Sequence, residues 1–229
     1  MISTLIENFI ATAQTEDDEM RGDLSALKLI PNFLTQKECE FFVSLVSPDS
    51  AATVQQLSNR KRLIVDSEPL AAWFWKRLKS HNAFRTIIDQ VGDTWIATGI
   101  NSRFRLVRYD AGDRFQTHED GFYWPRWDEK TFATAMVYLN NVKPDASGRV
   151  WGVTRFHRIH AVIEPAQGLL ITFLVNDLDH CGETCDSSKY LLRTDIFYKL
   201  QPPTQKDIAA WTQERLEIFA EFQRLSNMD

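Results

Sequence analysis

The chain has 229 residues, which fits one domain or one domain with an appended lobe. It is 44% hydrophobic and 12% aromatic, enough for a substantial core, and its formal charge of −5 without a basic run argues against a duplex-binding protein. The longest apolar stretch, 168–175, is too short to cross a bilayer, and the N-terminus lacks the features of a secretory signal. We therefore expect no membrane and no nucleic-acid partner.

The three cysteines, Cys39, Cys181 and Cys185, are too few for a disulfide framework. They favour reduced thiols in a cytoplasmic protein. Cys181 and Cys185 lie four residues apart. A zinc site, an oxidation-sensitive pair and simple packing all stay open for these two.

The first part of the chain predicts helices. Residues 1–24 predict a tail or a short helix. The segment "LKLIPNFL" then predicts a strand that Pro31 stops, and Thr35 with Glu38 three residues later forms a capping-box signature for a helix through Val46. The segment "SPDSAATVQQLSNRKR" is typical of a loop. A second helix is expected over "SEPLAAWFWKRLKSH", which carries one apolar face.

From Trp95 onward the pattern changes to short β-rich runs bounded by turn-forming residues. They are "SRFRLVRYD", "TFATAMVYLNNV", "VWGVTRFHRIHAVIEP", "GLLITFLVND" and "KYLLRTDIFYKL". Their spacing is typical of a sandwich or a barrel. We predict a mainly β fold in which residues 25–229 form a single domain: a helical support region at 25–94 packed on the sheet, the β core at 95–200 and a C-terminal helix at 201–229.

His118 and Asp120 are separated by one residue in "THED". At the end of a strand, positions i and i+2 point the same way, so both side chains can face one cation. An imidazole with a carboxylate suits Fe(II), Mn or Zn. The third ligand is expected on a neighbouring strand, and His180 follows the buried-looking run 168–175 at such a place. His157 and His160 are three apart and would face opposite sides of a strand.

Six motifs follow one another in an order that resembles the Fe(II)- and 2-oxoglutarate-dependent dioxygenases, specifically the prolyl 4-hydroxylase-like branch. They are "VRYDAGDRFQTHED", "AMVYLNNV", "WGVTRF", "EPAQGLLITF", "HCGE" and "KYLLRTDIFY". The similarity runs from about Leu27 to Lys199, with one departure: Trp151 stands where the family's turn has its first glycine. The resemblance implies a double-stranded β-helix, or jelly-roll, core and iron held by His118, Asp120 and His180.

The same resemblance implies 2-oxoglutarate as cosubstrate, consumption of O2, and support of activity by ascorbate. The distal carboxylate of 2-oxoglutarate needs a cationic anchor, and Lys189 and Arg193, four apart, share one strand face. Lys189 has nearly the family's commonest spacing from His180, whereas Arg193 fits the apolar register of its arginine strand better and is the preferred candidate. Tyr138 and Tyr109 match pocket tyrosines of the family.

The reaction implied is hydroxylation of an unactivated C–H bond, with 2-oxoglutarate converted to succinate and CO2. The family favours a prolyl residue in a peptide, while a free amino acid or a small metabolite stays open. The loop 121–127 offers Tyr123, Trp124, Arg126 and Trp127 for substrate binding, or a hydrophobic lid. The alternatives are a nucleic-acid demethylase, which the acidic charge disfavours, a structural zinc protein, and a non-catalytic metal- or ligand-binding jelly roll. The oligomeric state stays open.

Overall fold

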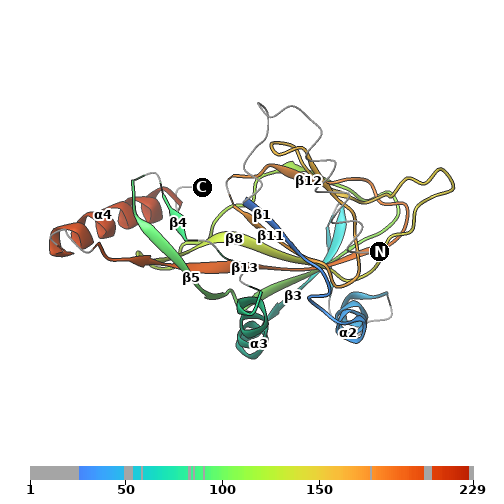
Figure 1. Ribbon diagram of the computed structural model, residues 1–229, viewed down its shortest axis with the longest axis horizontal. Coiled ribbons are helices and arrows are strands. Elements are labelled where there is room, and N and C mark those ends of the chain that lie inside the picture. Colours follow the sequence, from blue (N-terminus) through green and yellow to red (C-terminus); the bar gives the residue numbers. More distant parts are fainter. Residues whose placement is uncertain are drawn as a thin grey trace.

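The computed structural model describes residues 26–48, 54–57, 59–81, 84, 86–89, 91–175, 177–203 and 208–226. Two antiparallel sheets form the centre of the molecule, and helices flank the larger one (Figure 1). The fold is mainly β with a jelly-roll core, as the sequence predicted. The predicted tail or helix at 1–24 lies outside the described residues.

The larger sheet has nine strands in the part of the chain that is described. Seven run in the order β1–β11–β8–β13–β6–β3–β2, and β5, with β4 beside it, pairs with the second half of β13. Their bounds are β1 Leu27–Ile30, β2 Gln55–Leu57, β3 Arg60–Asp66, β4 Ile87–Ile88, β5 Thr94–Ile100, β6 Arg103–Tyr109, β8 Glu129–Tyr138, β11 Leu170–Leu174 and β13 Lys189–Gln201.

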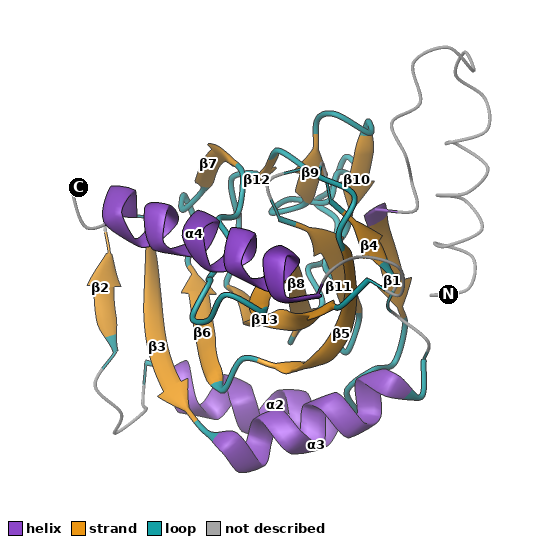
Figure 2. Cartoon of the chain, turned by 90° about the vertical axis from the view of Figure 1, so that its left-hand side faces the viewer, coloured by secondary structure: helices purple, strands orange, loops and turns teal. Residues whose placement is uncertain are grey.

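The smaller sheet faces the larger one and runs in the order β10–β9–β12–β7 (Figure 2). Its strands are β7 Phe115–His118, β9 Thr154–Phe156, β10 Ala161–Ile163 and β12 His180–Gly182. A hydrophobic core fills the space between the sheets, with Phe156 and Phe173 in edge-to-face contact at 5.0 Å between ring centroids. Tyr138 on the larger sheet donates a hydrogen bond of 2.6 Å to Thr154 on the smaller one. The sheets are thus joined by apolar packing and by a buried polar contact.

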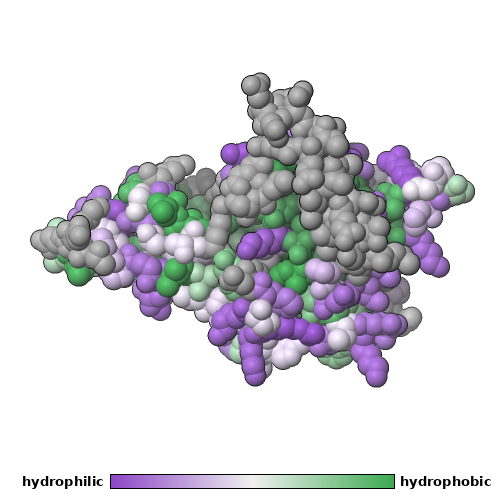
Figure 3. Space-filling model, in the orientation of Figure 1, coloured by the Kyte–Doolittle hydropathy of each residue, from purple (hydrophilic) through white to green (hydrophobic). Residues whose placement is uncertain are grey.

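Helices α2 (Gln36–Val46) and α3 (Glu68–Lys79) cover the outer face of the larger sheet (Figure 2). The predicted capping box of α2 is present: the Glu38 amide donates to the Thr35 hydroxyl at 3.3 Å, and the Thr35 amide donates to the Glu38 carboxylate at 2.7 Å. Phe74 of α3 is fully buried, with its ring 5.8 Å from that of Phe104 on β6. The outward sides of these helices are largely hydrophilic (Figure 3).

The region at 25–94, predicted as helical support, also contributes strands to the larger sheet. Strands β2 and β3 fall partly in a segment that was predicted to be a loop. The charged start of β3, "RKR", concealed this strand, because its apolar residues begin only at Leu63. Leu63 and Val65 pack towards the helices, so the intervening Arg62 and Ile64 face the space between the sheets.

The C-terminal helix α4 (Ile208–Ser226) confirms the prediction of a closing helix. Its Arg215 forms a buried ion pair with Asp93, which also accepts a 3.1 Å hydrogen bond from the indole of Trp211. A buried pair of this kind strongly penalises loss of either partner, which fixes α4 to the loop before β5. None of the described helices has the length and apolar character that crossing a bilayer requires.

Candidate metal centre

Two neighbouring strands of the smaller sheet bring the predicted triad together. His118 is the last residue of β7, and His180, the first of β12, pairs directly with it across the ladder. Asp120 follows β7 by two residues, and its carboxylate oxygens lie 3.5 Å from Nε2 of His118 and 4.0 Å from Nε2 of His180. The three potential ligand atoms all lie within 4.8 Å of one another. The triad is the only cluster of this kind among the described residues.

Backbone carbonyls hold both imidazoles in a ligand-ready orientation. Nδ1 of His118 lies 2.9 Å from the carbonyl of Gln116, and Nδ1 of His180 lies 3.0 Å from that of Leu178. A carbonyl only accepts, so each Nδ1 carries the proton and each Nε2 keeps its lone pair towards the centre. This is the outer support that metal-bound histidines typically have.

The Asp120 carboxylate is buried and strongly favours its ionised form. Burial by itself would raise its pKa, but the proximity of His118 and the charge of Arg193 outweigh burial and hold the pKa well below the usual value. Thr134 on β8 adds a 2.7 Å hydrogen bond to Oδ2. Asp120 is therefore ready to serve as an anionic ligand. Thr134 was not predicted from the sequence, although it shares a face of β8 with Tyr138, four residues on.

Aromatic rings surround His180. Its ring lies 4.7 Å from that of Phe173 and 5.3 Å from that of Phe156. Burial lowers the pKa of His180, against the opposing effect of Asp120. The neutral imidazole, which is the metal-binding form, is thus favoured at neutral pH.

Lys189 is the first residue of β13 and is almost completely buried, at 1% exposure. Its ammonium donates a 2.7 Å hydrogen bond to the carbonyl of Gly152 and lies 4.8 Å from the centre of the Tyr109 ring. No carboxylate of the described residues pairs with it, and burial lowers its pKa. A buried cation without an anion is costly, and a ligand carboxylate would supply the missing partner.

Arg193 lies on the same face of β13, but its guanidinium is already paired. Nη2 lies 2.9 Å from Oδ1 of Asp120 and 3.5 Å from Oδ1 of Asp195. Its side chain is half-buried and reaches the metal ligand itself. These contacts favour Lys189 over Arg193 as the cationic anchor, opposite to the preference drawn from the sequence register.

Both predicted pocket tyrosines face the space between the sheets. Tyr109 pairs with Lys189 across the β6–β13 ladder, and burial raises its pKa to about 12. Tyr138 pairs with Leu191, and burial raises its pKa despite the hydrogen bond to Thr154. Both hydroxyls therefore stay protonated at neutral pH. The Tyr109 hydroxyl can donate a hydrogen bond beside Lys189, whereas the Tyr138 hydroxyl already donates to Thr154.

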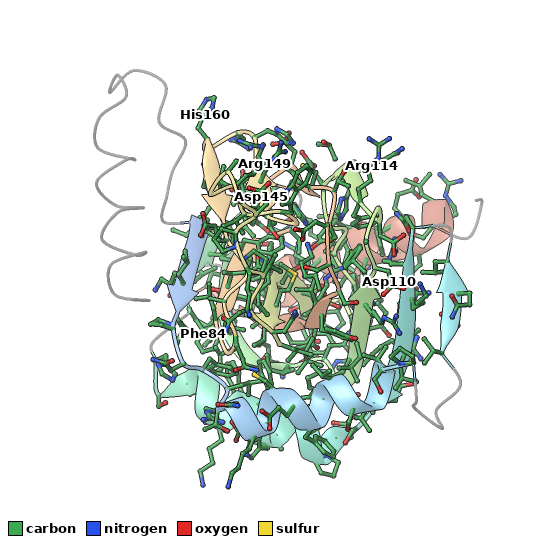
Figure 4. All side chains as sticks on the ribbon, turned by 90° about the vertical axis from the view of Figure 1, so that its right-hand side faces the viewer. Phe84, Asp110, Arg114, Asp145, Arg149 and His160 are labelled. Atoms are coloured by element: carbon green, nitrogen blue, oxygen red, sulfur yellow. The ribbon has the colours of Figure 1, made fainter. Side chains whose placement is uncertain are left out.

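The turn that carries Trp151 in place of glycine is held by its own loop. The indole donates a 2.8 Å hydrogen bond to Asp145, and the Arg149 guanidinium stacks 4.0 Å from the indole ring. Figure 4 shows Asp145 and Arg149 close together in this loop. Gly152 keeps the left-handed backbone, with φ +68°, and its carbonyl faces Lys189. Trp151 thus replaces only the first glycine of the family's turn, and the second, Gly152, is present and contacts Lys189.

The aromatic loop 121–127 packs mainly against α4. The Trp124 ring lies 5.3 Å from Phe219 and 4.9 Å from Phe222, and Trp127 lies 6.3 Å from Trp211. Arg126 pairs with Asp128. Tyr123 is 55% exposed and contacts Phe197. These contacts favour the lid interpretation for Trp124 and Trp127, whereas Tyr123 and Arg126 are exposed.

Cys181 and Cys185 are free thiols. Neither belongs to the metal-ligand cluster of the described residues. Cys185 is buried, and a side-chain carbon placed on Gly152 would lie 3.0 Å from its sulfur. Packing around the Gly152 turn is the role these contacts support for Cys185.

Two imidazoles and one carboxylate on one side of a centre are the ligand set of non-heme Fe(II) oxygenases, and the three residues fit it. Fold and ligand set together match the Fe(II)- and 2-oxoglutarate-dependent oxygenases. Three solved structures share the fold: a viral collagen prolyl hydroxylase from Paramecium Bursaria Chlorella virus-1 (TM-score 0.53, 20% identity, 77% of this chain, 97% of that one), a prolyl-4-hydroxylase from Pseudomonas putida (0.53, 14%, 82%, 97%), and a prolyl hydroxylase from Trichoplax adhaerens in complex with a hypoxia inducible factor peptide fragment (0.50, 15%, 84%, 92%).

A probable prolyl 4-hydroxylase from Arabidopsis thaliana is 25% identical over 125 residues, which cover 49% of this chain and 40% of that protein. No family model matches the chain. The predicted resemblance to the prolyl 4-hydroxylase-like branch is therefore confirmed in fold and in sequence. The chain spans less than half the length of the Arabidopsis relative.

Proposed function

We propose that the protein is an Fe(II)- and 2-oxoglutarate-dependent dioxygenase that hydroxylates an unactivated C–H bond. The proposal rests on two features that face each other. The smaller sheet carries His118, Asp120 and His180, and the larger sheet carries Lys189, which is buried without a carboxylate partner among the described residues. The first set suits a divalent metal, and the second suits a carboxylate. Iron(II) with bound 2-oxoglutarate would supply the oxidising chemistry, in which one oxygen atom of O2 enters succinate as 2-oxoglutarate loses CO2 and the other becomes the hydroxyl group of the product.

The residues of this chain would position the reactants. His118 and His180 would hold the metal through Nε2, with their Nδ1 protons fixed on backbone carbonyls. Asp120 would complete one side of the coordination sphere and leave the other side open. The rings of Phe156 and Phe173 would keep water from the His180 side.

Lys189 would bind the distal carboxylate of 2-oxoglutarate, and the Tyr109 hydroxyl would add a hydrogen bond, as would the Tyr138 hydroxyl on turning from Thr154. A carboxylate beside the ammonium would reverse the lowering of the Lys189 pKa and keep the lysine charged. Arg193, already held by two aspartates, would instead line the site near the metal. We propose a prolyl residue in a peptide as the first substrate class to test, with a free amino acid or small metabolite next.

The test is succinate formation from 2-oxoglutarate by the purified protein with Fe(II) and ascorbate in air, beside His118→Ala. We expect slow succinate formation without any added substrate, and none in the variant. Binding of 2-oxoglutarate in the presence of Mn(II) is measured alongside. Absence of both succinate and metal-dependent binding would refute the dioxygenase proposal and favour a non-catalytic jelly roll.

A further inference from the structure

Four arginines gather on the inner face of the larger sheet beside the triad. They come from three neighbouring strands, and we call them the inner arginine cluster: Arg60 and Arg62 of β3, Arg105 of β6 and Arg193 of β13. The ladder registers place them on one face. Arg193 pairs directly with Arg105, and Arg62 pairs with Val107, which lies two residues from Arg105 on β6. Arg60 lies two residues from Arg62 on β3, so all four side chains point the same way. All four side chains are half-buried.

The cluster lies close to the metal ligands. The guanidinium of Arg60 stacks 4.1 Å from the centre of the Phe115 ring, and that ring lies 4.2 Å from the ring of His118. Arg193 contacts Asp120 directly. A group held by Arg60 would thus be one aromatic ring away from His118.

Positive charge exceeds negative charge on this face. Arg105 and Arg193 share the carboxylate of Asp195. Arg60 and Arg62 have only neutral partners in the described chain, the side-chain oxygens of Asn59 at 2.8 Å and of Gln55 at 3.0 Å. A metal ion would engage Asp120, and 2-oxoglutarate would balance the charge of that ion. Neither therefore neutralises Arg60 and Arg62.

Placing like charges side by side on adjacent strands is unfavourable unless something else is gained. Burial, Arg60 and Arg105 all lower the pKa of Arg62, so its surroundings disfavour the charged form of this arginine. On the opposite face of β3, by contrast, Lys61 pairs with Asp110. Arg114, also near the triad in sequence, is exposed and points away from the molecule (Figure 4).

We propose that the inner arginine cluster binds an anionic group, a carboxylate or a phosphate, that the substrate carries next to the C–H bond to be oxidised. The guanidinium fork suits both groups, since it can give two parallel hydrogen bonds to either. A small anion fits better than a nucleic-acid backbone, because the cluster is confined to the inside of the sheet and the chain carries a net charge of −5. This inference rests on the proposed function, since it assigns the substrate class of the same site.

The first experiment measures anion binding without turnover. Protein loaded with Mn(II) and saturating 2-oxoglutarate is titrated anaerobically with inorganic phosphate by calorimetry, against chloride at equal ionic strength. We expect phosphate to bind in preference to chloride, and Arg62→Gln and Arg60→Gln each to weaken phosphate binding about tenfold or more, the loss of one charge-assisted contact. The matched control is Lys61→Gln, which removes the same charge from the opposite face of β3, and it should change binding by less than about twofold.

The second experiment identifies the source of the anion. Succinate formation is compared for N-acetylproline against its amide, and for peptides that differ only by Glu or Gln after proline. Stimulation by the anionic member alone, lost in Arg62→Gln, supports the proposal. Which of the two pairs shows this effect tells whether the substrate is a small acid or an acidic peptide. Equal stimulation by neutral members refutes it, as does phosphate binding that is absent or equal in Arg62→Gln and Lys61→Gln. Arginine-dependent binding of a single-stranded oligonucleotide more tightly than phosphate would reassign the cluster.

The two proposals fail separately. Phosphate binding that depends on Arg62, in a protein that neither binds 2-oxoglutarate nor forms succinate, would contradict the proposed function alone. Succinate formation with no preference for phosphate over chloride would contradict the anionic substrate alone.

Discussion

Replacing Lys189 with methionine is the sharpest test of the cosubstrate pocket. Methionine keeps much of the length and volume of the side chain but removes the buried ammonium that contacts Gly152 and the Tyr109 ring. A buried, hydrogen-bonded charge pair typically costs about 2–5 kcal/mol when one partner is removed, so the Kd for 2-oxoglutarate should rise by at least about 30-fold. Arg193→Met should have a smaller effect, because Arg193 is already paired with Asp120 and Asp195.

The assay is calorimetric titration of 2-oxoglutarate into Mn(II)-saturated protein without oxygen, so that neither variant turns over. Saturating metal separates cosubstrate binding from any effect of Arg193 on the Asp120 ligand. A Kd that rises more for Arg193→Met than for Lys189→Met would refute our reasoning. It would restore the preference that the sequence register gave to the arginine.

Four further predictions follow from the same geometry. In the absence of ligands, Lys189→Met should be more stable than the wild type at neutral pH and lose this advantage as the pH rises towards 10.5. Burial lowers the folded-state pKa of Lys189, so unfolding takes up a proton in this range and the wild type gains stability as the pH rises. Urea melts of both proteins across pH 7–10 test this. Asp120→Asn keeps the shape but removes the ligand charge, and should weaken Mn(II) binding by at least about 30-fold in a metal titration. Gly152→Ala should destabilise the protein by about 1–2 kcal/mol in urea and weaken 2-oxoglutarate binding, since φ is +68° and the new carbon would lie 3.0 Å from Cys185 Sγ. Trp124→Ala should lower the free energy of unfolding by about 2–3 kcal/mol through lost packing on α4. An unchanged melting curve would favour substrate binding over the lid interpretation for the aromatic loop.

Local sequence signals were enough for much of the fold. The capping box of Thr35 and Glu38 involves residues three apart, so helix α2 could be located without knowledge of the rest of the chain. His118 and Asp120 are likewise close in sequence. His180 required the order of motifs along the chain, because its pairing with His118 joins strands 62 residues apart.

The choice between Lys189 and Arg193 could not be made from sequence. Both lie on one face of β13, and only burial and the position of carboxylates distinguish them. Strands β2 and β3 were missed for a related reason: the first three residues of β3, all charged, have partners outside that strand, which no local pattern reveals. The inner arginine cluster depends on the same registers and was equally hidden.

The division of the centre between two sheets has a thermodynamic consequence. The triad is on the four-stranded sheet, whereas Lys189 and the inner arginine cluster are on the nine-stranded one, so the distance between them depends on the apolar layer and the Tyr138–Thr154 hydrogen bond. The short strands β7, β9 and β12 can open before the larger sheet unfolds, and opening would release the metal. Metal binding should then slow hydrogen exchange in the smaller sheet far more than in the larger one. The bound metal would thus stabilise only the smaller sheet against local opening.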